Sequence, residues 1–290
     1  TLTDNNEPVP VSISANGPRL IIKPGRALSQ CGRIKLSVQG QLVSNHNIPG
    51  NYPWSHNARV ICYTVGAIGY SAKGRPINAW RFGNGPSKIL YFGAMHGSEQ
   101  GTKYLMDRWI SELSANPDRI PAHRTLVIIP TLNPDGFAVG SRRNANNVDL
   151  NRNFAVSNWK KDVTMPGGEL VVNGGGSAPM SEPESQAIAS LVQREGFRAI
   201  ITYHSTGSVV VPNEAGDSAS LAQTYSSQAR YRFLPPSQSH TVFEYDLTGA
   251  FEDWTLEKLG IPTLVVELGS HTYHDFDRNK NAMWSMATLP

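Results

Sequence analysis

The sequence has few cysteines, few charged residues and no long apolar run. Cys31 and Cys62 are its only cysteines among 290 residues, too few for the disulfide framework of a small secreted domain. They could form one bridge across a loop of about 30 residues, which would stabilise the fold by roughly 3 to 4 kcal/mol. The alternative is two buried thiols. No run approaches the ~18 apolar residues of a membrane-spanning helix, so we expect no membrane span.

Clusters of one charge sign are also missing. The 26 basic and 23 acidic residues are scattered along the chain and give a net charge of +3. Without a basic cluster to follow a phosphate backbone, we expect no nucleic-acid partner. The chain begins with Thr1 and shows no signal peptide, which indicates processing or trimming. Charged residues are only 17% of the chain, and this composition favours a secreted or periplasmic protein, which we assume to be a monomer.

The first 57 residues differ in pattern from the rest. Two alternating stretches, residues 9–22 and 33–43, are broken by Gly, Pro and Asn and predict short strands joined by turns. The segment 47–56, rich in Pro, Asn and Gly, is expected to connect this β-rich extension to a main domain. We therefore divide the chain into an extension, residues 1–57, and a catalytic domain, residues 58–290.

In the second region, apolar runs of strand length alternate with stretches of helical spacing. The runs are residues 88–95, 125–130, 199–204 and 263–268, and the helical stretches are 101–113, 185–194, 219–231 and 249–259. This alternation is typical of an α/β domain with a mixed central sheet flanked by helices. Ser181 and Glu184 predict a capping box before the second helix, and the Gly-rich stretch 167–176 predicts a surface loop.

Polar side chains at the ends of three of these runs are the candidates for chemistry. His96 and Glu99 follow the first run, His204 ends the third, and Glu267 lies near the end of the fourth. In open α/β sheets the reactive groups gather beyond the carboxyl ends of the strands. Two His and one Glu can hold a catalytic zinc ion with an open position for water. The alternatives are ordinary polar loop residues, or a site for another divalent metal.

Further motifs resemble the zinc metallocarboxypeptidase family of the carboxypeptidase A type. The likeness begins at about residue 59 and follows the family's order, with Asn133-Pro134-Asp135-Gly136, Arg142, the run 149–154, Tyr203-His204-Ser205, the stretch 245–254 and the strand that carries Glu267. The resemblance implies a carboxypeptidase-like α/β/α fold and one zinc ion held by His96, Glu99 and His204.

The resemblance also implies roles in the reaction. Glu267 would be the base that activates the attacking water, and Arg142 would polarise the scissile carbonyl and stabilise the oxyanion. Asn151, Arg152 and Tyr245 would hold the terminal carboxylate of the substrate. The alternatives are a buried structural acid, surface ion pairs and a packing aromatic.

Two departures from the animal digestive enzymes bear on the substrate. Gly97 and Ser98 stand between the first two ligands, where those enzymes carry an Arg, and this resembles the bacterial murein-peptide branch. That branch cleaves between γ-D-glutamate and diaminopimelate. Glu252, seven residues after Tyr245, falls where the family sets side-chain preference. A buried carboxylate there would favour a Lys or Arg side chain or the distal amine of diaminopimelate; the alternative is an exposed helix residue.

We therefore expect a zinc metallopeptidase that acts on peptide or murein-peptide substrates. The alternatives are a carboxypeptidase that removes C-terminal basic residues, an N-acyl amino-acid deacylase, and a catalytically inactive protein that binds peptide or cell wall. For the extension we favour a strand-rich brace tied on by the two cysteines. An inhibitory prosegment and a cell-wall contact surface are the other interpretations.

Overall fold

The computed structural model describes residues 1–16, 19–28, 32–38, 41–43, 49–51, 54–59, 62–165, 167–235, 237–238 and 247–289. The chain divides into two compact units, Thr1–Tyr63 and Thr64–Pro290. The boundary that the sequence places at residue 57 stays a prediction. No helix among the described residues is both long and apolar enough to cross a membrane.

The first unit is β-rich, as predicted. Strands β1 (Leu2–Asp4), β2 (Glu7–Val9), β5 (Arg33–Val38) and β8 (Trp54–Arg59) form an antiparallel sheet in the order β2-β1-β5-β8. Two hairpins accompany it, β3 (Val11–Asn16) with β4 (Arg19–Pro24) and β6 (Gln41–Val43) with β7 (Pro49–Asn51). Cys62 is disulfide-bonded, and Cys31 lies outside the described residues. The role of this unit stays a prediction.

The prediction of a connector at residues 47–56 is wrong, because β7 and part of β8 occupy it. Main-chain pairing with β5 forms β8, in a register that sets Arg59 opposite Arg33. Residues 55–58 are exposed, so this strand has no buried alternation that the sequence could reveal.

The second unit is built on an eight-stranded mixed sheet in the order β17-β16-β18-β15-β11-β12-β10-β9. Its centre is parallel and consists of β12 (Arg124–Ile129), β11 (Ser87–Phe92), β15 (Ala199–Ser205) and β18 (Thr263–Leu268). Antiparallel neighbours β10 (Pro76–Phe82) and β16 (Val209–Pro212) flank it. The edges are β9 (Tyr63–Tyr70) and β17 (Arg232–Phe233). The predicted mixed sheet is confirmed.

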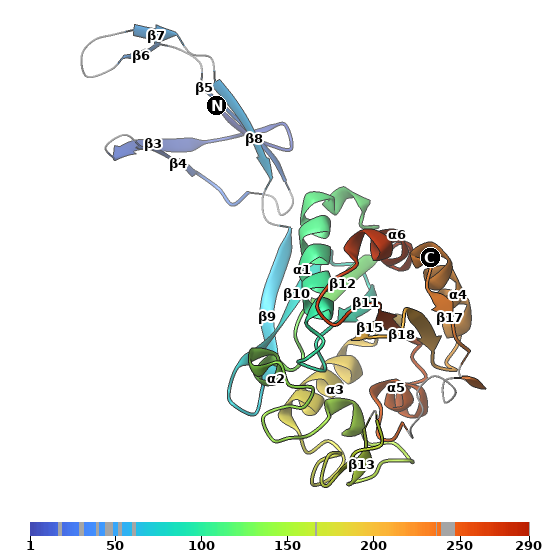
Figure 1. The fold of residues 1–290 in the computed structure, drawn as a ribbon. Helices are drawn as coiled ribbons and strands as arrows, with labels where there is room; N and C mark the ends of the chain where they lie inside the picture. Colours follow the sequence, from blue (N-terminus) through green and yellow to red (C-terminus); the bar gives the residue numbers. More distant parts are fainter. Residues whose placement is uncertain are drawn as a thin grey trace. The chain divides into compact units, whose positions relative to one another are not determined.

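Helices cover both faces of this sheet (Figure 1). On one face lie α1 (Gln100–Ala115), α4 (Ser218–Ala229) and α6 (Phe276–Ala287), and Trp109 of α1 packs between Tyr91 of β11 and Trp284 of α6. On the other lie α3 (Pro183–Glu195) and α5 (Phe251–Leu259), where Phe92 of β11 meets Phe251 edge to face. Because successive strand residues point to opposite faces, Tyr91 and Phe92 anchor the two layers.

Local details differ from the sequence-based expectations. The predicted capping box is wrong, because Glu182 is the residue before α3 and makes no side-chain cap. Ser181 instead donates its hydroxyl to the carboxylate of Glu182. The Gly-rich stretch holds a short strand, β14 (Leu170–Val171), that pairs with β13 (Val163–Thr164). Three short turns, α2 (Pro134–Val139), η1 (Pro117–Arg119) and η2 (Leu150–Arg152), complete the elements of this unit.

Candidate active site

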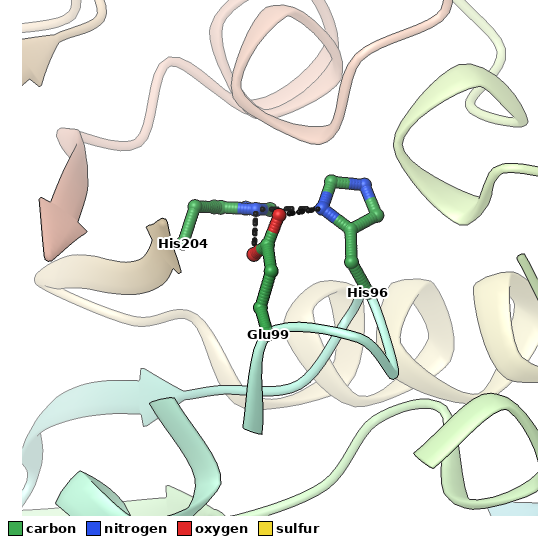
Figure 2. Close-up of side chains that lie close together, drawn as sticks. All are labelled: His96, Glu99 and His204. Carbon is green, nitrogen blue, oxygen red and sulfur yellow. Dashed lines mark hydrogen bonds and ion pairs between the residues drawn. The ribbon is translucent and has the colours of Figure 1, made fainter. Parts of the chain in front are cut away.

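His96 and Glu99, in the loop after β11, form a buried cluster with His204, which lies near the carboxyl end of β15 (Figure 2). The Nδ1 atom of His96 lies 2.8 Å from Oε1 of Glu99, and Nδ1 of His204 lies 3.3 Å from Oε2 of Glu99. The two Nδ1 atoms are 3.1 Å apart. All three ligand atoms therefore face one point, within 4.8 Å of one another.

This donor set fits a zinc ion. Two imidazole nitrogens and one carboxylate are the ligands of one class of catalytic zinc site. The far nitrogen of each ring has an oxygen partner, since Nε2 of His96 lies 3.0 Å from Asp149 Oδ1 and Nε2 of His204 lies 3.2 Å from Thr202 Oγ1. A proton on each Nε2 satisfies these oxygens and leaves both Nδ1 lone pairs for a metal. His96 and its neighbours also hold the pKa of Glu99 below its ordinary value against the opposing effect of burial.

The loop that carries His96 and Glu99 is held by the segment that begins at Asn133. The side chain of Asn133 donates to the carbonyl of Met95 and accepts from the backbone N–H of Gly136 at the start of α2. A Cβ atom at Gly97 would lie 2.0 Å from the carbonyl carbon of Gly136. Glycine between the two ligands is therefore required by the close approach of a second backbone.

Glu267 lies beside the cluster because β15 and β18 are parallel neighbours. Their register sets His204 opposite Glu267. The Glu267 side chain is buried but lines the cavity described below. Burial raises the pKa of Glu267 to about 7, assisted by the charge of Glu99 and opposed by His204 and Arg142.

Arg142 and Asp149 link the cluster to the cavity wall. Nε of Arg142 donates to Oδ2 of Asp149 at 2.9 Å, and Nη1 donates to Oε1 of Glu99 at 3.3 Å. Burial would raise the pKa of Asp149, but Arg142 and His96 hold it well below its ordinary value. Asp149 is thus a fixed anion that orients both a ligand ring and the Arg142 guanidinium.

Asn151 and Arg152 lie in η2, directly after Asp149. The backbone N–H of Asn151 donates to Asp149 at 2.9 Å, and its side-chain oxygen accepts from the backbone of Phe251 at the start of α5. Its amide nitrogen lies 3.5 Å from Oε2 of Glu252. Arg152 is 1% exposed and donates to the carbonyl of Asn151 at 2.6 Å. These contacts bring η2 and α5 to the same side of the cluster.

A single cavity of about 650 Å³ joins these groups. Eight of the nine residues predicted from the sequence line it, namely His96, Glu99, Arg142, Asn151, Arg152, His204, Glu252 and Glu267. The ninth, Tyr245, lies outside the described residues.

Among the other residues that line the cavity, Ser205, Asp253 and His271 were not predicted to belong to the site. Burial, together with Glu252, raises the pKa of Asp253 to about 7. The signals were their places in the sequence, since Ser205 follows a ligand, Asp253 follows Glu252, and His271 comes just after β18. The imidazole of His271 takes part in the cavity, because its Nδ1 lies 2.8 Å from the hydroxyl of Ser205.

Two known proteins with similar sequences are, by name, an endopeptidase and a murein peptide amidase. Gamma-D-glutamyl-L-diamino acid endopeptidase 1 of Lysinibacillus sphaericus is 24% identical over 248 residues, which cover 71% of this chain and 60% of that protein. Murein peptide amidase A of Escherichia coli (strain K12) is 33% identical over 121 residues, which cover 40% of this chain and 48% of the amidase. The chain thus spans about half the length of the curated relatives it matches.

The fold is shared with a solved structure. The murein-tripeptide amidase of Escherichia coli O157 superposes with a TM-score of 0.61 at 22% identity, over 78% of this chain and 92% of that one. Residues 56–283 match the sequence pattern of the zinc carboxypeptidases. Because this match takes in nearly all of the unit that holds the sheet and the cavity, the chain belongs to the zinc carboxypeptidase family.

Proposed function

We propose that this protein is a zinc-dependent hydrolase that cleaves the amide bond between γ-D-glutamate and diaminopimelate in bacterial cell-wall peptides. The observation that carries the proposal is the shared cavity, in which Asn151, Arg152 and Glu252 lie beside the metal cluster. Such a cavity offers donors for a carboxylate and an acid for an amine at one side of the reacting bond. The names of the two sequence relatives support the same substrate class.

We assign the metal to His96, Glu99 and His204. Bound there, zinc would act as a Lewis acid on the scissile carbonyl and lower the pKa of a water to about 7. Glu267 accepts the proton of the attacking water and returns it to the nitrogen of the leaving amine. A carboxyl whose pKa is raised to about 7 can do both near neutral pH.

Arg142 stabilises the negative charge that develops on the carbonyl oxygen. Asp149 and Glu99 hold its guanidinium at the cavity wall, so the group is oriented before substrate binds. A preoriented donor costs little reorganisation during the reaction, which is why such groups lower the barrier effectively.

The leaving residue binds on the side of η2 and α5. Arg152 and Asn151 hold its carboxylate, and Glu252 together with Asp253 takes its distal amine. Diaminopimelate carries both of these groups. The sequence also predicts that Tyr245 holds the same carboxylate. Secretion or export to the periplasm gives access to this substrate and belongs to the same proposal.

A second candidate function is the removal of C-terminal Lys or Arg from peptides. The pair Glu252 and Asp253 would suit a basic side chain equally well. The inactive binding protein is disfavoured, because the described cavity holds the three ligand residues together with Glu267 and Arg142. An N-acyl amino-acid deacylase would need the same groups, so the assay below separates it from the peptidase.

Product analysis by mass spectrometry separates the candidates. The zinc-loaded protein is incubated with a murein tripeptide, a peptide ending in Lys and an acylated amino acid. We expect release of diaminopimelate from the tripeptide to be the fastest reaction. Faster release of Lys would support the second candidate, and hydrolysis of the acylated amino acid alone would contradict both.

A further inference from the structure

The cavity also has a group of polar lining residues to which the proposed reaction gives no role, and we call this group the second end of the cavity. Ser98, Ser205, Thr206 and His271 line this end with hydroxyl groups and an imidazole. Substrate-binding cavities that hold polar groups in fixed positions use them to orient particular chemical groups of the ligand.

Hydrogen bonds attach this second end to Glu99. The backbone N–H of Ser205 donates to Oε2 of Glu99 at 3.2 Å, and the Ser205 hydroxyl lies 2.8 Å from Nδ1 of His271. The η2 side is attached to His96 instead, since Asp149 contacts both His96 and the backbone N–H of Asn151, and Asn151 in turn contacts α5. A substrate whose leaving residue occupies the η2 side therefore places its acyl residue toward His271.

The position of His271 is fixed by its main chain. The carbonyl of His271 accepts from the backbone N–H of Gly101 in the first turn of α1 at 2.6 Å. A Cβ atom at Gly101 would lie 2.5 Å from the carbonyl oxygen of Tyr273, so this loop packs directly on the helix. The imidazole itself is exposed. With Nδ1 held by Ser205, Nε2 has no hydrogen-bond partner among the residues that the structure describes.

A γ-linked glutamyl residue has a feature that an α-linked residue lacks. Its side-chain carboxyl forms the scissile amide, so its α-carboxylate stays free on the acyl side of that bond. Resting on the proposed function, we infer that Nε2 of His271 donates a hydrogen bond to this free α-carboxylate and thereby selects γ-linked substrates. Ser205 is a positioning residue that holds the ring.

The test compares two tripeptides that differ at one group. One is L-alanyl-γ-D-glutamyl-diaminopimelate, and the other carries an amide in place of the glutamyl α-carboxylate. We expect His271→Ala to lower kcat/KM for the free acid about tenfold and to change kcat/KM for the amide less than about twofold, because only the acid forms the charge-assisted hydrogen bond. His271→Gln, which keeps a donor, restores part of the preference for the acid.

His123→Ala is the matched control, since His123 is also exposed and lies just before β12, outside the cavity lining. It should leave both rates unchanged. An equal loss on both tripeptides, or no loss with His271→Ala, overturns the inference while the proposed function stands. If the wild type cleaves neither tripeptide but releases Lys from a C-terminal Lys peptide, both the proposed function and this inference are overturned.

Discussion

Glu267 and Asp253 are both carboxyls of the cavity with a pKa raised to about 7, yet we assign them different tasks. Glu267 lies opposite His204 in the sheet register, beside the metal cluster. Asp253 lies in α5 next to Glu252, whose charge adds to the effect of burial. Because Glu267 is next to the metal ligands, we assign it the proton transfer. Because Asp253 is next to Glu252, we assign it to binding the cationic group of the substrate.

Replacing Glu267 by Gln tests the first assignment. We expect the variant to bind zinc as the wild type does, because Glu267 is outside the three-residue cluster. We expect kcat to fall by about 10² to 10⁴, the usual contribution of a general base. In the wild type, kcat/KM should decrease as the pH falls below about 7, since the base must be ionised. Metal analysis and pH-rate profiles measure both effects, and an unimpaired kcat would rule out the assignment.

Asp253 makes the fold sensitive to pH. Its pKa is about 7 in the folded chain and 3.8 as the ordinary value, so the folded state binds this proton more tightly than the unfolded state. The contribution to the free energy of unfolding is therefore present at low pH and is lost as the pH rises from about 4 to about 7. The direction follows because folding disfavours the ionised form of this carboxyl.

Asp253→Asn should remove this dependence. We expect the free energy of unfolding of the variant, measured relative to that of the wild type, to be roughly 1 to 2 kcal/mol higher at pH 8 than at pH 5. This value is discounted for the partial exposure of the group. Urea unfolding at the two pH values measures the difference. An identical pH dependence in variant and wild type would show that the carboxyl does not titrate differently on folding.

Among the elements, the turn α2 has a direct effect on the metal cluster. Gly97→Ala should push the backbone of Gly136 away from the loop that carries His96 and Glu99, because the added Cβ has no space. We expect a loss of stability of roughly 1 to 3 kcal/mol and weaker zinc binding. Gly66→Ala is the control, since a Cβ there meets nothing within 4 Å. Thermal unfolding and zinc titration compare them, and equal behaviour of the two variants would contradict the contact.

The buried parallel strands could be predicted from sequence because each is a continuous apolar run. In β15 and β18 every residue is buried, and the runs end at His204 and Glu267. The metal cluster followed from the same pattern, since neighbouring parallel strands bring their carboxyl ends together.

Helix α6 was missed because its buried face contains a polar residue. Asn279 is fully buried there, where it donates to the Tyr231 hydroxyl and accepts from Tyr225. This interrupts the apolar periodicity on which helix prediction depends. Strand β16 has only four residues, too few for a clear pattern. The position of His271 depends on the path of a loop, which strand and helix patterns do not fix.

For the molecule as a whole, the zinc ion should contribute to stability as well as to chemistry. Three buried ligand residues, two from the loop between β11 and α1 and one from β15, would be joined by one ion, so zinc is expected to bind the folded chain far better than the unfolded chain. We expect a chelator to abolish hydrolysis and to lower Tm by roughly 10 °C, as follows from free zinc at about 1,000 times its Kd. Calorimetry with and without chelator measures this shift. Added zinc should restore both properties, and an unchanged Tm would mean that the site is not structural.

The place of β18 in the sheet has a consequence for the biosynthesis of the enzyme. It is the last strand in sequence order among the described residues, yet it lies between β15 and β16 in the interior of the sheet. While a ribosome is still translating the residues before 263, the nascent chain has a gap in its sheet and lacks Glu267. Contacts so distant in sequence also form slowly. Hydrolytic activity that depends on Glu267 therefore begins only after translation has passed this strand.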